Sequence, residues 1–294
     1  VINLYAATFL VGGAVHSTFR WWSPLPNGLR DGRRALGTAL IAIGGLLPGI
    51  GGALTKAGIV EALYVGELLG IVLLPLYPQY STATTASSFD AWKELATFKV
   101  PTAEIREYPV EPGFIAASVA LVKEGLAQAG DGPKRVLFSA HGLPEKIVKA
   151  GDPYQWQVER TAAAIAAAAG LEDWAVCYQS RVGPLKWIGP STHDEIERAG
   201  RDGVAVVVYP LAFVSEHSET LVELDIEYRA VAEKAGVTHY RRAPTVGTHP
   251  AFVEGLARAA RKAAFADTTM CTAGPDGAPC PADRLRCPRR VASL

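Results

Sequence analysis

Residues 204–228 have the sequence VAVVVYPLAFVSEHSETLVELDIEY, and this stretch decides the fold class. Val204–Tyr209 is an uninterrupted apolar run of the kind found in strands that are buried on both faces. Ser218–Ala235 then has the length and the patterning of a helix. A fully apolar strand that leads into a helix is the repeating unit of parallel α/β sheets, so we expect a parallel sheet covered by helices.

The same alternation continues on both sides of this stretch. Apolar runs typical of strands lie at Ile71–Leu76, Arg135–Ser139 and Trp174–Gln179. Helical patterns lie at Ser87–Leu95, Phe114–Ala129, Tyr154–Ala169 and His249–Ala264. Beyond Phe265 the chain contains many Pro, Gly and Cys residues, and we expect irregular structure there. The sequence after residue 70 thus predicts an α/β fold.

The composition limits the partners of the protein. The 294 residues include 29 Lys and Arg and 29 Asp and Glu, so the formal net charge is zero. A neutral chain has no overall field that attracts a nucleic acid, and we expect no nucleic acid as a partner. The 4 cysteines are too few for a secreted disulfide scaffold of this size, so we expect a reducing compartment, the cytoplasm.

The first 70 residues have a different character. Residues 1–19 contain no Asp, Glu, Lys or Arg, and residues 35–55 form a second such run. A helix needs roughly 20 apolar residues to cross a bilayer, and both runs have about that length. The arginines between them would face the cytoplasm by the positive-inside rule. We therefore expect residues 1–70 to form an apolar helical segment, either inserted in a membrane or packed as a Gly- and Ala-rich helix pair in a soluble core.

Polar side chains follow several of the predicted strands. In open α/β sheets ligands bind beyond the carboxyl ends of the strands, so such positions are candidates for a site. His141 follows the strand at 135–139, where Gly142 and Pro144 predict a tight turn. A single histidine after a strand is more commonly structural than catalytic, so His141 alone leaves both interpretations open.

A row of carboxylates begins where the predicted helix at 218–235 starts. Glu219, Glu223 and Glu227 are four residues apart and therefore lie on one face of a helix. His217 lies at the N-terminal end of this row. A line of carboxylates with an imidazole at one end could pass cations inward or protons outward. The alternative is a solvated acidic face, which the spacing alone does not exclude.

Four segments, taken together, resemble the ferrochelatase family. They are LPLYPQYSTATTASSF (Leu74–Phe89), FSAHGLP (Phe138–Pro144), CYQSRVGPLKWIGP (Cys177–Pro190) and YPLAFVSEHSETLVELDIEY (Tyr209–Tyr228). They occur in the order that the family has, and the resemblance extends from about Ile71 to Ala264. Residues 1–70 do not resemble the family, and its N-terminal quarter has no counterpart in the sequence.

The resemblance implies the class II chelatase fold, with two Rossmann-like parallel-sheet domains around a porphyrin cleft. We expect an apolar helical segment at 1–70, an incomplete first chelatase domain at 71–130, the second domain at 131–265, and an irregular tail with cysteines at 266–294. The strands missing from the first domain would leave an apolar edge of its sheet open.

The resemblance also implies an activity, the insertion of Fe(II) into protoporphyrin IX or coproporphyrin III with release of two protons, a lyase reaction of heme biosynthesis. His141 matches the histidine at the porphyrin centre, a proton acceptor or metal ligand, and Glu219 matches the glutamate across the cleft from it. A polar path behind Glu219 would consist of Glu216, His217, Glu223 and Glu227. The porphyrin-binding residues would be Tyr77, Gln179, Ser180, Trp187 and Phe213. The implied partners are a porphyrin, ferrous iron and, through residues 1–70, a membrane.

The cysteines raise the question of a cofactor. The implied reaction requires no cofactor, and Fe(II) is its substrate. Some members of the family hold a [2Fe–2S] cluster with three tail cysteines and one upstream, and the cysteines here are Cys177, Cys271, Cys280 and Cys287. Four thiolates are the number that such a cluster needs. The wide gaps between the tail cysteines favour the alternative, a tail with free thiols.

The sequence leaves two other functions open. Without the N-terminal quarter, the chain would be a catalytically dead, membrane-anchored remnant that binds a tetrapyrrole without turnover. A chelatase that uses cobalt or nickel is the other alternative, although the long motifs favour the iron enzymes.

Overall fold

The computed structural model of the chain describes residues 71–96, 102–181, 183–264, 270–271 and 280–288. Apart from Ile71 and Thr102 these residues belong to one compact unit, Val72–Thr97 together with Ala103–Leu294. The helical segment predicted at 1–70, with its two apolar runs, lies outside the described residues. Within the described ranges no helix is both long enough and apolar enough to cross a membrane.

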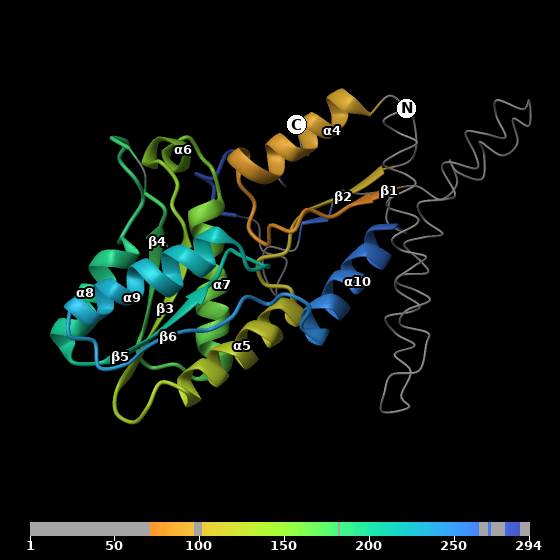
Figure 1. Ribbon diagram of the computed structural model, residues 1–294. Helices are drawn as coiled ribbons and strands as arrows, with labels where there is room; N and C mark the ends of the chain where they lie inside the picture. The colour runs from red at the N-terminus through yellow and green to blue at the C-terminus, as the bar shows by residue number, and fades with distance from the viewer. Residues whose placement is uncertain (1–70, 97–101, 182, 265–269, 272–279, 289–294) are drawn as a thin grey trace, which may run out of the picture. The chain divides into compact units, whose positions relative to one another are not determined.

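Four parallel strands form the larger sheet, in the order β4-β3-β5-β6 (Figure 1). Their bounds are β3 Lys134–His141, β4 Trp174–Gln179, β5 Ala205–Pro210 and β6 Tyr240–Arg242. The central strands β3 and β5 are buried along almost their whole length, as strands with helices on both faces must be. His141 stands opposite Gln179 in the register, so β3 and β4 end at the same level.

Helices cover both faces of this sheet (Figure 1). They are α5 (Pro112–Ala127), α7 (Tyr154–Ala169), α8 (Thr192–Asp202), the π-helix η2 (Glu219–Glu227) and α9 (Tyr228–Lys234). Phe138 and Tyr209 pack in the core beneath α5 and α7, whereas Leu137 and Val208 pack in the core beneath α8, η2 and α9. Successive side chains of a strand point to opposite faces, and therefore two separate cores form.

A smaller sheet has the order β1-β2-β7. Its strands are β1 (Ile71–Leu73), β2 (Thr102–Glu107) and β7 (Met270–Cys271), and β7 runs parallel to β2. Around it lie the π-helix η1 (Thr82–Ala86), α4 (Ser87–Leu95) and α10 (Pro250–Ala264). The short helix α6 (Glu145–Lys149) belongs to the larger sheet, where its Val148 packs in the core beneath α5 and α7. A third core joins α5 and α10 through the rings of Tyr108, Phe114 and Phe252, whose centroids lie 5.7–6.4 Å apart.

The predicted fold class is confirmed, because both sheets contain parallel strands that alternate with helices. The helices expected at Ser87–Leu95 and Tyr154–Ala169 and the strand expected at Trp174–Gln179 have the predicted bounds. The strand expected at 71–76 ends at Leu73, just before Leu74 and Pro75, since proline has no N–H to donate to a neighbouring strand. In the tail, which was expected to be irregular, Met270–Cys271 pairs with β2.

Candidate active site

The end of β3 and the start of η2 place an imidazole beside a carboxylate. His141 is the last residue of β3, and Glu219 is the first residue of η2. Nε2 of His141 lies 3.5 Å from Oε2 of Glu219. The side chains are 42% and 37% exposed, so the pair is accessible and is not sealed in the core. The resemblance implied that a cleft separates the two groups, whereas here they lie within ion-pair distance of each other.

The orientation of the His141 ring fixes its tautomer. Nδ1 lies 2.7 Å from the carbonyl oxygen of Gly142, and a carbonyl oxygen only accepts, so Nδ1 carries the proton and donates it. In the neutral ring Nε2 therefore keeps its lone pair. The hydroxyl of Tyr154 donates to the carbonyl oxygen of His141 at 3.1 Å and holds the end of the strand. The site thus offers one free basic nitrogen, directed at Glu219.

The pair opens into a cavity of about 490 Å³. Its wall consists of Leu76, Tyr77, Gln79, Thr84, His141, Tyr154, Ala212, Phe213, Val214, Ser215, His217 and Glu219. The ring of Phe213 lies 4.7 Å from the imidazole of His217, centroid to centroid. Nδ1 of His217 accepts a hydrogen bond from the backbone N–H of Glu219 at 3.1 Å, which orients both residues. Apolar walls with a few convergent polar groups are typical of small-molecule sites.

Five of the predicted site residues therefore meet at one cavity: Tyr77, His141, Phe213, His217 and Glu219. Trp187 lies elsewhere, in the wall of a second cavity of about 470 Å³ that also includes Ser180 and Glu223. Gln179 is completely buried and is absent from the wall of either cavity. The predicted porphyrin-binding set thus divides into two groups and one buried side chain.

Glu223 is held by four hydrogen bonds. Its carboxylate accepts from the backbone N–H and the hydroxyl of Ser180, at 2.8 and 2.6 Å, and from Nε2 of Gln179 and the hydroxyl of Tyr228, both at 3.1 Å. The Ser180 hydroxyl also lies 3.1 Å from Oε2 of Glu219 and links the two carboxylates. Ser180 has a φ of 58°, a left-handed conformation that is rare for a residue other than glycine.

The η2 segment is a π-helix, in which the predicted row of carboxylates takes a modified form. A π-helix closes i→i+5 hydrogen bonds and is wider than an α-helix, so a four-residue spacing still brings Glu219 and Glu223 to the same side. Glu227 is exposed to solvent. Ser180 therefore joins the carboxylates of Glu219 and Glu223, whereas Glu227 lies at the surface.

Glu216, the remaining residue of the predicted path, is bound to an arginine. Nη1 of Arg242 lies 3.0 Å from both carboxylate oxygens of Glu216, and Nε of Arg242 donates to Asp225 at 2.8 Å. The backbone N–H of Thr245 donates to Glu216 at 2.9 Å. Burial would raise the pKa of Glu216, but these hydrogen bonds outweigh it and lower the pKa. Glu216, in the loop before η2, is thus bound to the end of β6 and to the segment that follows it.

Because the pKa of Glu216 is lower in the folded state, its contribution to stability is present above its unfolded pKa of about 4.3 and is lost as the pH falls through the lower folded value. We expect Glu216→Gln to reduce the free energy of unfolding at neutral pH and to make almost no difference in acid. Urea unfolding of both proteins over an acidic pH series checks this. A difference that stayed constant with pH would contradict it.

The sequence analysis missed Tyr154 and Tyr228, which line the two cavities, and Asp152, which supports Tyr154. Oδ1 of Asp152 accepts from the backbone N–H of Tyr154 at 2.9 Å, and Oδ2 accepts from the backbone and the hydroxyl of Thr82, both at 2.7 Å. Asp152 is completely buried and joins the turn after β1 to the start of α7. The Asp-Pro pair before the helix at 154 is a capping signal, and it could have identified this residue.

The four-cysteine cluster is not supported, because the larger sheet separates two of its predicted ligands. Cys177 is buried beneath α8, where Thr192 donates to its Sγ at 3.4 Å, and burial raises the pKa of the thiol to about 12. Sγ of Cys280 lies 3.8 Å from Nε2 of Gln157 in α7, which covers the opposite face. Cys177 and Cys280 thus lie on opposite faces of the larger sheet, and the side chain of Cys271 lies outside the described residues.

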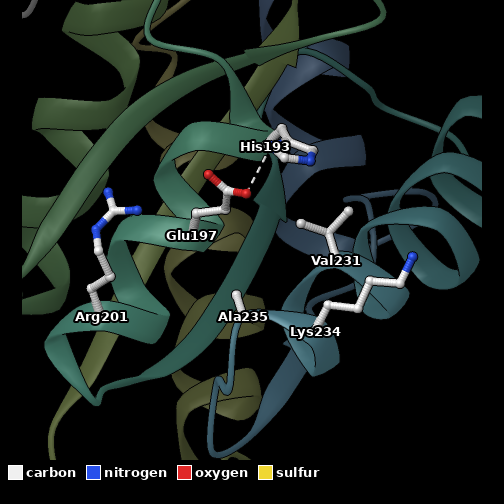
Figure 2. A pocket seen from close by; sticks show the side chains of 6 residues that line it. All are labelled: His193, Glu197, Arg201, Val231, Lys234 and Ala235. Carbon is white, nitrogen blue, oxygen red and sulfur yellow. Dashed lines mark ion pairs between the residues drawn. The ribbon is translucent and has the colours of Figure 1, made fainter.

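A third cavity, of about 310 Å³, lies between α8 and α9 (Figure 2). It contains a second imidazole–carboxylate pair, in which Nδ1 of His193 lies 3.9 Å from Oε1 of Glu197. Its other lining residues are Arg201, Val231, Lys234 and Ala235. This pocket has no aromatic wall, and its imidazole and carboxylate come from one turn of a single helix. It therefore serves as an internal comparison for the pair at His141.

Comparison with known proteins agrees with the segments quoted from the sequence. The family model described as Ferrochelatase matches residues 57–264, so the match begins earlier than the expected residue 71. The ferrochelatase of Caulobacter vibrioides is 52% identical over 226 residues, which cover 75% of this chain and 64% of that protein. The ferrochelatase of Hyphomonas neptunium is 48% identical over 223 residues, 74% of this chain and 61% of that protein. The chain thus spans less than two thirds of the length of these relatives.

Among solved structures, SirB from Bacillus subtilis with Fe3+ aligns with a TM-score of 0.48 and 15% sequence identity. The alignment covers 70% of this chain and 75% of that chain.

Proposed function

This chain belongs to the ferrochelatase family, and from this premise we propose that it inserts Fe(II) into a porphyrin with release of two protons. The observation that carries the proposal is the accessible contact between His141 and Glu219 at the cavity of about 490 Å³. That volume falls within the range of about 300–1,000 Å³ typical of small-molecule sites. The substrate would be protoporphyrin IX or coproporphyrin III, in heme biosynthesis.

We assign His141 the role of proton acceptor. Metal insertion removes two protons from pyrrole nitrogens, and a neutral imidazole is a suitable base near neutral pH. Gly142 holds the ring so that Nδ1 is protonated and Nε2 keeps its lone pair. Nε2 would therefore accept one proton, pass it to solvent through the open cavity and then accept the second. The carboxylate of Glu219, 3.5 Å away, would stabilise the imidazolium that forms.

We propose that the carboxylate of Glu219 binds the incoming metal. Nε2 of His141 would be the second ligand, as long as this nitrogen has not taken a proton. An imidazole and a carboxylate suit a divalent first-row metal. Sites that retain a metal as a structural element commonly use four protein ligands, so two donors fit a metal that is passed on. Glu223 would hold Ser180 against Glu219 and keep negative charge behind it.

The aromatic side chains at the cavity would receive the macrocycle. Tyr77 is 44% exposed at the cavity wall and offers a flat apolar surface, as does Phe213. Trp187 and Ser180, at the second cavity, would bind a more distant part of the substrate.

The proposal also includes the domain boundaries at 130 and 265 and the membrane association of residues 1–70. We propose a cytoplasmic location, since the buried Cys177 is a thiol and not part of a disulfide.

The test is a porphyrin fluorescence assay on the purified chain with Fe(II) under anaerobic conditions and, in parallel, with Zn(II). Loss of free-porphyrin fluorescence, with the absorption spectrum of the metalloporphyrin, is expected at a rate proportional to protein concentration. Porphyrin binding without turnover would instead identify a non-catalytic tetrapyrrole-binding protein. Turnover with cobalt or nickel but not with iron would identify the other type of chelatase.

A further inference from the structure

Gln179 occupies an unusual place at the site. It is the last residue of β4, it is completely buried, and it stands beside His141 in the register of the sheet. Its backbone carbonyl oxygen accepts from the N–H of Gly142 at 2.9 Å. The carbonyl of Gly142 in turn accepts from Nδ1 of His141. The backbone of Gln179 is therefore connected to the imidazole through one residue.

The side chain of Gln179 reaches the other half of the pair. Nε2 donates to the backbone carbonyl oxygen of Glu219 at 3.2 Å and to the carboxylate of Glu223 at 3.1 Å. Oε1 accepts from the hydroxyl of Ser139 at 2.7 Å. A flipped amide would turn its oxygen toward the two acceptors on η2, so the orientation of the amide is fixed.

These contacts all come from buried or partly buried groups, where a hydrogen bond to a charged partner is strong and an unmade one is costly. Glu219 has no side-chain contact with Gln179, and no substrate could reach Gln179 in the described structure, because its side chain has no exposed surface. Its effect on Glu219 passes through the backbone of η2 and through Glu223 and Ser180.

We propose that Gln179 is a positioning residue that sets the distance between Nε2 of His141 and the carboxylate of Glu219. One residue is joined to the end of β3 through its backbone and to the start of η2 through its amide. The inference rests on the proposed metal insertion and adds to it the buried residue on which the geometry of the pair depends. It also replaces the porphyrin contact that was expected of Gln179.

Two variants separate positioning from packing. Gln179→Met has a similar length but no donor, and we expect the kcat of porphyrin metallation to fall by about 10–100-fold, the usual effect of removing a partner that orients a site. The KM for porphyrin should stay unchanged, because Gln179 does not touch the substrate. Gln128→Glu, at the exposed end of α5, is the control and should have the kinetic constants of the parent chain.

Gln179→Glu adds a pH signature. At neutral pH its carboxylate would face the carboxylate of Glu223 and the carbonyl of Glu219, and activity should fall as in Gln179→Met. In acid the new carboxyl group takes a proton and becomes a donor again. The charged or titratable groups around it are Glu219 and Glu223 from η2 and His141 from β3, and these are the same in both variants. The activity of Gln179→Glu relative to Gln179→Met should therefore rise as the pH falls.

Unchanged kcat in both variants would overturn the proposal, as would a rise in the porphyrin KM with kcat retained. Equal pH profiles of the Glu and Met variants would also overturn it. If the parent chain itself does not metallate porphyrin, the proposed function fails and the positioning role is read from crystal structures. The distance from Nε2 of His141 to Oε2 of Glu219 should then lengthen in Gln179→Met, and an unchanged distance would contradict the role.

Discussion

Replacing His141 by alanine is expected to slow porphyrin metallation by about 10²–10⁴-fold, the contribution that a positioned general base makes. The variant loses the only ring nitrogen that lies within ion-pair distance of Glu219 among the described residues. It should fold normally, because the His141 side chain is 42% exposed and its loss leaves no buried cavity. Stopped-flow fluorescence at saturating porphyrin and metal measures the rate constant, and the thermal midpoint Tm checks the fold.

His239→Ala is the matched control for this experiment. It also removes an exposed imidazole, but at the residue before β6 and outside the two cavities of the proposed site, whereas His193 of the pocket in Figure 2 also lines the second cavity. We expect the rate of His239→Ala to equal that of the parent chain. Equal rates for His141→Ala and the parent chain would contradict the role of His141, whereas equal losses in the two variants would point to a general effect on folding.

Replacing Glu219 by glutamine is expected to reduce kcat by about 10²–10³-fold, comparable to the loss of an electrostatic group that acts on the transition state. The substitution keeps the size of the side chain and removes the charge that would receive Fe(II) and stabilise the His141 imidazolium. Porphyrin affinity, measured by fluorescence titration without metal, should be unchanged. The dependence of the rate on metal concentration should shift to higher concentrations.

Glu233→Gln provides the control for charge alone. Glu233 lies on α9 and is exposed to solvent, so its replacement changes the net charge by the same amount without entering the site. The parent rate is expected for this variant. If Glu219→Gln metallated porphyrin at the parent rate, the carboxylate at the cavity would have no part in the reaction.

The alternation of apolar runs and helical patterns in the sequence predicted many of the strands and helices. It did not predict β2 and α8. β2 has the sequence TAEIRE, in which only Ile105 is a large apolar residue, and it forms a strand because its neighbours in the smaller sheet pair with it. α8 has the sequence THDEIERAGRD and buries Ile196 and Ala199 among many charged residues. Tertiary packing determined β2, which local propensity did not indicate. In α8, by contrast, Ser191 caps the start by accepting from the N–H of Asp194, and Gly203 ends the helix in the left-handed conformation, so these local signals could have identified it.

The candidate site, too, was predicted only in part. The rule that ligands bind at the carboxyl ends of strands was enough to bring His141 and Glu219 to one edge of the sheet. The direct contact between them, the tautomer of His141 and the burial of Gln179 depend on register and on the π-helical turn of η2. Cys177 was included in the predicted cluster only because four thiolates are the number that such a cluster needs. Its side chain points to the face of the sheet away from α7.

The most direct test is to follow proton release and metalloporphyrin formation together in a single turnover of the purified chain in weakly buffered solution. Two protons per metalloporphyrin are expected, and they should appear with the same rate constant as the product. The double variant His141→Ala/Glu219→Ala should give neither signal while it still binds porphyrin. If the double variant released protons and formed product as fast as the parent chain, metal insertion would not take place at His141 and Glu219.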